Sequence, residues 1–201
     1  MKKLLLVSVG LIVLSGCVSQ KTSNKTSGSN DQVSSQLDTS SSDSGLSTVL
    51  PILSSEDKTA EVITKTLVFP PTENGAVLRQ VITYQGKAYL KIVLEQTSPA
   101  ESNIQEAISQ LGLEETQRQF AETLTNDENF KVANQIQGVE LSLELTADSK
   151  IKMTSVLNIQ SLDLPQFEAS SYFKGVDLRG ITKLSPEEYI LNRQSAGATV
   201  E

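Results

Sequence analysis

The segment from Val139 to Thr146 carries the most constraining pattern in the chain. Apolar residues at positions 139, 141, 143 and 145 alternate strictly with polar ones. Because a β-strand points successive side chains to opposite faces, this alternation predicts a strand with one buried face and one face in water. Sheets covered on one side only are typically antiparallel. The pattern therefore favours an antiparallel sheet with helices on one face.

Four other segments have strand character. Residues 61–69 are rich in β-branched side chains and end at two prolines, and Asn74-Gly75 supplies a turn into residues 76–84. Residues 88–95 and 151–159 complete the set. Within 88–95, the alternation predicts a buried face and a solvated face, formed respectively by Leu90, Ile92 and Leu94 and by Tyr89, Lys91 and Glu95.

The middle of the chain changes to helical spacing. Ser98-Pro99-Ala100-Glu101 combines a capping serine with a proline at the first helical position, which predicts a helix start. A second helix is expected over 113–124, and Ser185-Pro186-Glu187-Glu188 predicts the start of a last helix, with residues after Gln194 frayed. Strands, helices, strands and a helix in this order indicate an α+β fold.

The N-terminus has the form of a lipoprotein signal peptide. Lys2 and Lys3 precede an apolar run of about eleven residues, which suits a secretory signal and is too short to span a bilayer. Small residues at Ser15 and Gly16 then precede Cys17, the single cysteine. We expect cleavage between Gly16 and Cys17 and attachment of diacylglycerol to the Cys17 thiol, because two acyl chains anchor a protein stably. The predicted location is the extracytoplasmic face of the cell membrane.

The charge composition limits the kinds of partner that the protein can bind. The whole chain has a formal net charge of −7, and loss of Lys2 and Lys3 leaves 17 − 2 = 15 basic against 24 acidic residues, a net charge of −9. An acidic surface is repelled by phosphate backbones and anionic lipid heads. We therefore expect no nucleic-acid partner, and membrane contact through the lipid alone.

Composition also divides the chain into three parts. Residues 1–16 form the signal peptide. Residues 17–58 comprise the lipidated cysteine and a Ser/Thr-rich tract, which is too poor in large apolar residues to fold and is predicted to be a disordered tether. Its one apolar island, Val49 to Leu53, either docks on the domain or is a chance run. Residues 59–201 have the length of a single domain.

Several segments resemble the YehR-like bacterial lipoproteins. The resemblance lies in the hairpin Ile82-Thr83-Tyr84-Gln85-Gly86-Lys87, in Gly138-Val139-Glu140 at the start of a strand, and in Leu162-Asp163 with Phe167, together with the lipobox and the paired helices. Lys87 departs from the acidic residue expected after the hairpin glycine. The resemblance implies the envelope location and the α+β fold, and it supplies no catalytic residues.

The residue inventory limits catalysis. The chain contains no histidine, and Cys17 is reserved for lipid, which removes the usual general base, the usual thiol nucleophile and the commonest metal ligands. Ser171 and Lys174 have the spacing of a serine acyltransferase pair, but the accompanying Lys-Thr-Gly strand is absent and the domain is too small. We therefore expect no enzyme activity, no catalytic residue, no cofactor and no metal.

Four residues are candidates for a binding surface. Asp163 lies between two leucines, where an acid is either buried for a specific purpose or turns the chain before Pro165. Phe167, Tyr172 and Phe173 would edge a shallow apolar groove or pack in the core. The sequence favours the turn and the core for these residues.

Three functions remain from these residues. The leading one is a lipid-anchored, non-catalytic domain that binds an envelope protein or another envelope component. The alternative is a small-ligand-binding lipoprotein or transport accessory, which requires a concave apolar pocket. A carboxylate-dependent enzyme acting on cell-wall sugar is the third, and it requires two acids facing each other across a cleft.

Overall fold

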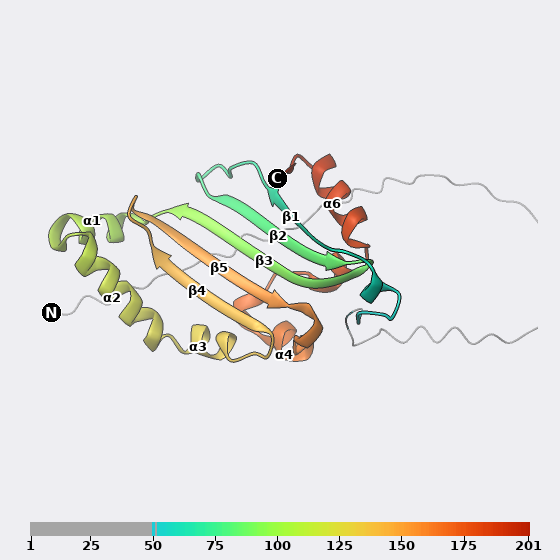
Figure 1. Cartoon of the computed structure of the whole chain (residues 1–201). Coiled ribbons are helices and arrows are strands. Elements are labelled where there is room, and N and C mark those ends of the chain that lie inside the picture. Colours follow the sequence, from blue (N-terminus) through green and yellow to red (C-terminus); the bar gives the residue numbers. More distant parts are fainter. Residues whose placement is uncertain (1–49, 51) are drawn as a thin grey trace, which may run out of the picture.

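The computed structural model describes residue 50 and residues 52–201. One six-stranded antiparallel sheet dominates this part of the chain, in the order β4-β5-β3-β2-β1-β6 (Figure 1). The first three strands form a meander, and the chain then passes through three helices before it returns as β4 and β5 beside β3. The strands are β1 (Val62–Val68), β2 (Val77–Gln85), β3 (Ala88–Pro99), β4 (Val139–Leu145), β5 (Lys150–Asn158) and β6 (Thr199–Val200).

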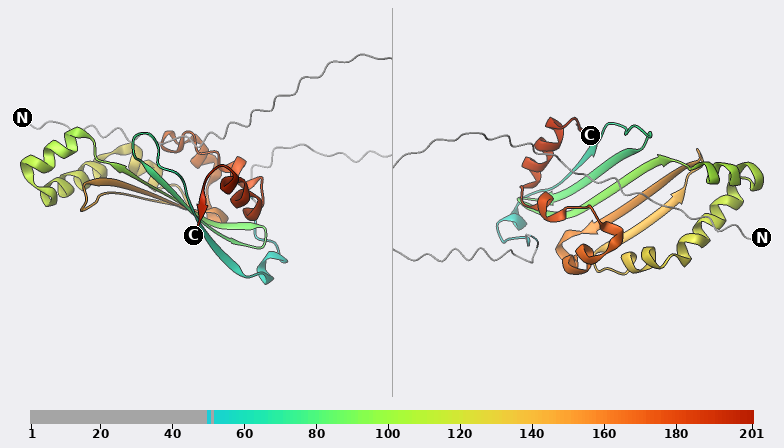
Figure 2. Two further views of the ribbon diagram at one scale, coloured as in Figure 1. Left: turned by 90° about the horizontal axis from the view of Figure 1, so that it is seen from above. Right: turned by 180° about the vertical axis from the view of Figure 1, so that it is seen from behind.

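The α-helices all lie on one side of the sheet, as both views of Figure 2 show. This arrangement confirms the α+β fold with helices on one face. The α-helices are α1 (Ser102–Leu111), α2 (Leu113–Asn126), α3 (Glu128–Asn134), α4 (Leu164–Ala169), α5 (Leu178–Thr182) and α6 (Pro186–Ser195), and the 3-10 turns are η1 (Asp57–Thr59), η2 (Ile159–Ser161) and η3 (Ser171–Phe173).

The helix-side face of the sheet carries two apolar clusters. The larger cluster joins the centre of the sheet to α4, α5 and α6, with Leu157 and Tyr189 among its fully buried members. The smaller cluster lies where α1 and α2 cover the far end of β4 and β5, around Ile104 and Phe120. Since burial of one large apolar side chain contributes about 1.5–3 kcal/mol, these clusters hold the helices to the sheet.

A β-bulge corrects the predicted faces of β3. The register between β2 and β3 shifts at Thr83/Tyr84, so that Tyr84 pairs with Tyr89 while Thr83 pairs with Lys91. The extra residue, Leu90, reverses the alternation, and Tyr89 is buried on the same side as Ile92. The prediction that Tyr89 faces water was wrong. Its hydroxyl donates to the carbonyl oxygens of Ile181 and Leu184, and burial raises its pKa.

The predicted helix start at Ser98-Pro99 was also wrong. The strand β3 continues to Pro99, because Ser98 pairs with Ile151 and Pro99 with Lys150 on β5. Proline is tolerated at this strand end because its missing N–H is not needed there. The helix α1 begins three residues later, after Glu101.

The free edge of β4 is partly closed by side chains from the helices. Asn134 of α3 accepts a hydrogen bond from the backbone N–H of Leu141 (2.7 Å), and the Gln117 amide of α2 donates to the carbonyl oxygen of Leu145 (2.6 Å). Unpaired strand edges are templates for unwanted pairing. These two contacts protect β4 from it.

The chain end forms a strand, contrary to the frayed end predicted after Gln194. Gly197 turns the chain with φ +100°, Ala198 is buried, and β6 pairs with Leu67 and Val68 of β1. The backbone of Glu201 also exchanges two hydrogen bonds with Thr66. The long-range pairing partner on β1 orders this short segment.

Helix α6 is held at its start and along its buried side. Ser185 and Glu188 form a capping box, as the motif predicted. Below the helix, the Tyr189 hydroxyl donates to the side-chain oxygen of Gln80, a fully buried residue of β2. The Gln80 amide nitrogen has no hydrogen-bond partner among the residues that the structure describes.

The predicted signal peptide, the lipidation site and most of the tether lie outside the described residues. At the start of the described part, Leu50 is buried in the larger cluster and the backbone N–H of Leu53 donates to Gln160. The apolar island thus docks on the domain through Leu50. No helix in the described part of the chain is long and apolar enough to cross a membrane.

Candidate functional site

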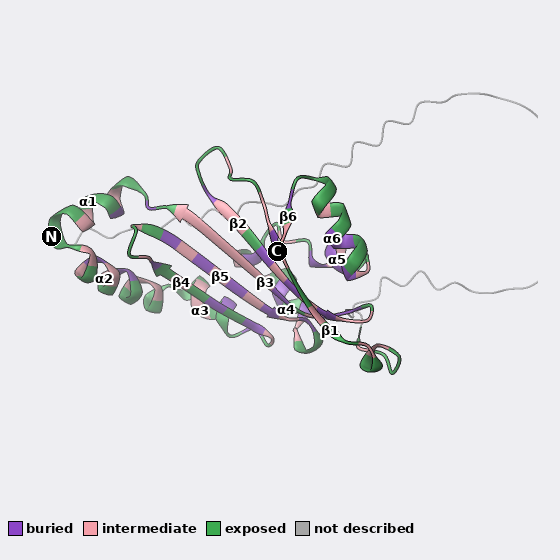
Figure 3. Cartoon of the chain, turned by 45° about the horizontal axis from the view of Figure 1, so that its top comes forward, coloured by how far each residue is buried: buried purple, intermediate pink, exposed green. Residues whose placement is uncertain are grey.

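The sheet side opposite the helices is not covered by any helix of the described domain (Figures 1 and 2). Buried and unburied residues alternate along the strands, as Figure 3 shows, because the side chains on one side of the sheet pack under the helices and those on the other side do not. We call this side the bare face. It consists of residues 62, 64, 66 and 68 of β1, 77, 79, 81, 83 and 85 of β2, 91, 93, 95, 97 and 99 of β3, 140, 142 and 144 of β4, and 150, 152, 154, 156 and 158 of β5, with Glu201 beside Thr66 at its edge.

An apolar row crosses the middle of the bare face. Val81, Val93 and Val156 lie directly opposite one another on β2, β3 and β5. Thr66 continues the row on β1 and Glu140 ends it on β4. The three valines are half-buried by their neighbours and are not covered by any helix. They form a short apolar stripe on a polar surface.

Balanced charges surround this row. Glu95 of β3 lies 3.6 Å from the Arg79 guanidinium and 3.6 Å from the Lys152 ammonium, while Lys91 has no ion-pair partner among the described residues. The basic residues of the bare face are Arg79, Lys91, Lys150 and Lys152, and its acidic residues are Glu95, Glu140, Glu144 and Glu201. Glu201 lies 3.1 Å from the Arg79 guanidinium, and Lys150 is paired with Asp148. The acidic character of the chain therefore resides elsewhere.

The aromatic candidates predicted from the sequence pack in the core. Phe167 and Phe173 are 1% and 4% exposed and stack on each other with ring centroids 4.3 Å apart. Tyr172 is half-buried against Phe130, its hydroxyl lies 3.5 Å from the sulfur of Met153, and burial raises its pKa to about 12. Phe167 and Phe173 therefore pack in the larger apolar cluster, which is the alternative that the sequence favoured for them.

Asp163 and the Ser171–Lys174 pair have local roles. The Asp163 carboxylate accepts hydrogen bonds from the backbone N–H (3.0 Å) and the side-chain amide (2.8 Å) of Gln166, so it caps α4. Ser171 begins η3 and is exposed, and Lys174 follows this 3-10 turn and is exposed. The two side chains make no hydrogen bond with each other in the described part of the chain, although the 3-10 turn lies between them.

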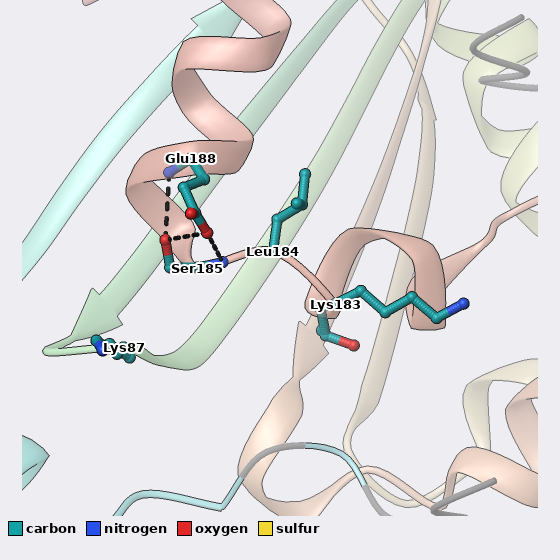
Figure 4. Close-up of a pocket in the computed structure, with 6 residues that line it drawn as sticks. Lys87, Lys183, Leu184, Ser185 and Glu188 are labelled. Atoms are coloured by element: carbon teal, nitrogen blue, oxygen red, sulfur yellow. Dashed lines mark hydrogen bonds between the residues drawn. The ribbon is translucent and has the colours of Figure 1, made fainter. Parts of the chain in front are cut away.

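A shallow depression of about 330 Å³ lies at the start of α6. Figure 4 shows its lining, in which Glu188 points back to Ser185, while the Lys183 ammonium points away from both. The residues that line it are Lys87, Thr182, Lys183, Leu184, Ser185 and Glu188.

Two polar residues of this depression, Ser185 and Glu188, bind each other. Glu188 Oε2 accepts from the Ser185 hydroxyl (2.7 Å) and from the Ser185 backbone N–H (2.9 Å). These two hydrogen bonds hold the pKa of Glu188 below its usual value, with a smaller contribution from Lys87. The carboxylate thus occupies the helix N-terminus, where an external anion would otherwise bind. The depression lies at the capped start of α6, and Leu184 is the one apolar residue in its lining.

Metal ligands do not gather anywhere in the part of the chain that the structure describes. No group of three or more His, Cys, Asp or Glu side chains there is arranged to hold an ion.

The described part of this protein is an α+β domain, built on one sheet with helices on a single face. A model of YehR-like proteins matches residues 62–193, and the chain belongs to the YehR-like family.

Two solved structures are similar to this chain. An NMR structure of a protein from Streptococcus pneumoniae TIGR4 is 27% identical with a TM-score of 0.67, and the match covers 89% of this chain and 100% of that one. The NMR structure of the E. coli YehR protein is 17% identical with a TM-score of 0.46, covering 71% of this chain and 92% of that one. No match was found among curated proteins.

The bare face was only partly visible in the sequence. The alternation of β4 indicated a solvated face. The alignment of Val81, Val93 and Val156 depends on the strand order and on the register past the bulge, and no local pattern encodes either. The β-branched residues at unburied positions were the available signal.

Proposed function

We propose that this protein is a lipid-anchored envelope lipoprotein whose domain binds another protein through the bare face and performs no catalysis. In this proposal Cys17 carries the diacylglyceryl group on the extracytoplasmic side of the cell membrane. The residues before Leu50 then separate the domain from the bilayer.

The observation that carries the proposal is the valine row on an uncovered sheet face. Folding has already used the other face to hold α1 to α6, so the valines contribute little to the core. A half-buried apolar stripe that no helix covers, with polar surroundings, resembles a protein contact surface, which has an apolar centre and a polar rim.

The chemistry of the bare face favours a protein over other partners. It has no aromatic side chain on which a sugar ring would stack, and its basic residues are matched by acidic ones, so it has no excess positive charge for phosphate or anionic lipid. β-branched side chains with paired charges suit a flat protein surface. The depression beside α6 does not favour the small-ligand alternative, because Ser185 and Glu188 in its lining already bind each other.

Site-specific photo-crosslinking in intact cells tests the proposal. A photoreactive amino acid replaces Val156 on the bare face of the full-length chain. The matched control places it at Leu191, an apolar residue of α6 that is 63% exposed on the helix side. We expect a discrete crosslinked protein product from position 156 that is absent from position 191.

The product must also depend on the valine row. A second substitution, Val93→Asp, places a charge in the centre of the row and should remove the product from position 156. No product at 156, or equal products at 156 and 191, would contradict the proposal. Replacement of Cys17 by serine tests the anchor separately, because the chain should then leave the membrane fraction.

A further inference from the structure

The charges of the bare face are arranged so that this face is complementary to itself. On β3, Lys91 and Glu95 lie on the bare face two residues before and two residues after Val93. A two-fold axis that runs along the valine row exchanges these two positions. Two copies related by this axis would place Lys91 of each opposite Glu95 of the other.

We propose that the bare face binds the same face of a second copy of this chain. This inference rests on the proposed function and names its partner. The valine rows lie against each other, and Lys91 and Glu95 form two reciprocal ion pairs between the copies. Such a contact is isologous, the commonest closed arrangement in homodimers, and two sheets packed in this way lie about 10 Å apart. Lysine and glutamate side chains together span that distance.

The neighbouring strands fit the same axis. On β5, Asn158 and Thr154 flank Val156 and would exchange places, and on β2 Thr83 would face Arg79 of the other copy. None of these pairs brings like charges together. Two charged residues of the bare face lie on the axis itself, Glu140 and Glu201, and they lie at the two ends of the valine row, at the rim of the contact.

The charge distribution removes the main obstacle to self-association. The chain has a net charge of −7, which repels identical copies. The bare face is the exception, because its four basic and four acidic residues balance. Lys91 is the cation there without an ion-pair partner among the described residues, and the second copy supplies one.

A charge-swap experiment on two differently tagged full-length copies in the same cells tests the inference. After crosslinking, one tag is purified and the yield of the other is measured. The Lys91→Glu variant should give about tenfold less copy-to-copy product with itself, because two carboxylates then face each other at both sites. The Glu95→Lys variant should lose its product with itself for the same reason.

The decisive sample combines the two variants. A Lys91→Glu copy together with a Glu95→Lys copy should recover the yield of the parent chain, since opposite charges again meet across the axis. Lys183→Glu is the matched control: it makes the same charge change on an exposed residue outside the bare face, and it should leave the yield unchanged. Recovery in the mixed sample also excludes misfolding as the cause of the losses.

Three results would overturn the inference. One is a parent chain without any copy-to-copy product, and another is a pair of single variants that retain it. The third is a product from position 156 that contains a different protein, or that joins residues 18–49 of the same chain. A different protein would overturn the second copy as partner and leave the proposed function standing, whereas no product at 156 would contradict the proposed function.

Discussion

The two faces of the sheet are made by the same strands and differ in almost everything else. On β3, Ile92 is fully buried under the helices, whereas Val93, the next residue, is half-buried and faces outward. The helix side carries Tyr189, Phe167 and the buried Gln80, and the bare face carries valines, threonines and paired charges. The comparison teaches that folding uses one face and leaves the other available.

The largest expected difference between the faces concerns apolar packing. Ile92→Ala should lower the free energy of unfolding by about 2–5 kcal/mol, because it leaves a cavity at the centre of the larger cluster. Val93→Ala, one residue away, should lower it by less than about 1 kcal/mol. Chemical denaturation measures both. Equal losses would show that the bare face is part of the folding core.

Loss of a polar pair should also destabilise the fold more on the helix side of the sheet than on the bare face. Tyr189→Phe removes the donor to buried Gln80 and should cost about 1–3 kcal/mol. Adding Gln80→Leu should restore part of that loss, because the unpaired amide is removed as well. On the bare face, Thr64 and Thr83 share an exposed hydrogen bond of 3.1 Å, and Thr64→Val should change stability by at most about 0.5 kcal/mol. Thermal unfolding of the parent chain and the three variants measures these differences. A larger loss from Thr64→Val than from Tyr189→Phe would contradict the comparison.

The helix side and the bare side can also be compared within the single edge strand β4. Asn134→Ala leaves the Leu141 N–H without its partner and should cost about 1 kcal/mol. Hydrogen exchange at the Leu141 amide should become faster. Ser142→Ala, on the bare side of the same strand, should leave both stability and exchange near those of the parent chain. Unchanged exchange in the Asn134 variant would mean that this contact does not protect the edge.

The smallest effect concerns pH at the start of α6. Because hydrogen bonds from Ser185 lower the pKa of Glu188 in the folded state, its contribution is present above the unfolded pKa and is lost as pH falls through the folded value. Between about pH 5 and pH 3, the stability of Glu188→Gln should therefore fall less steeply than that of the parent chain. Ser185→Ala should flatten the same slope and cost about 1 kcal/mol near neutral pH. If the stability of both variants falls with pH as steeply as that of the parent chain, Glu188 does not have this capping role.

Local sequence signals predicted much of the fold. The alternation of Val139–Leu145 and the Ser185 capping motif placed β4 and α6 because each pattern is complete within a few residues. The strands near 62–68, 77–85 and 150–158 followed from β-branched runs and turn residues. The fold class and the YehR-like family were also correctly predicted from the sequence.

The errors have a common physical cause, which is pairing between distant segments. The bulge at Leu90 reversed the face of Tyr89, and pairing with β5 kept Pro99 in a strand where the local motif indicated a helix. The segment after Gln194 became β6 only because β1 offers an edge. The bare-face row also arises from strand order, so the candidate site depended on the same information that the sequence pattern lacked.

The yield of crosslinked product from position 156 in the Val93→Asp chain tests the central claim most directly, with thermal unfolding measured on the same variant. The claim is that folding occupies the helix side of the sheet and binding occupies the bare face. We predict a yield at least about tenfold below that of the parent chain, with a cooperative unfolding transition retained. A folded Val93→Asp chain that gives the parent's yield would contradict the claim.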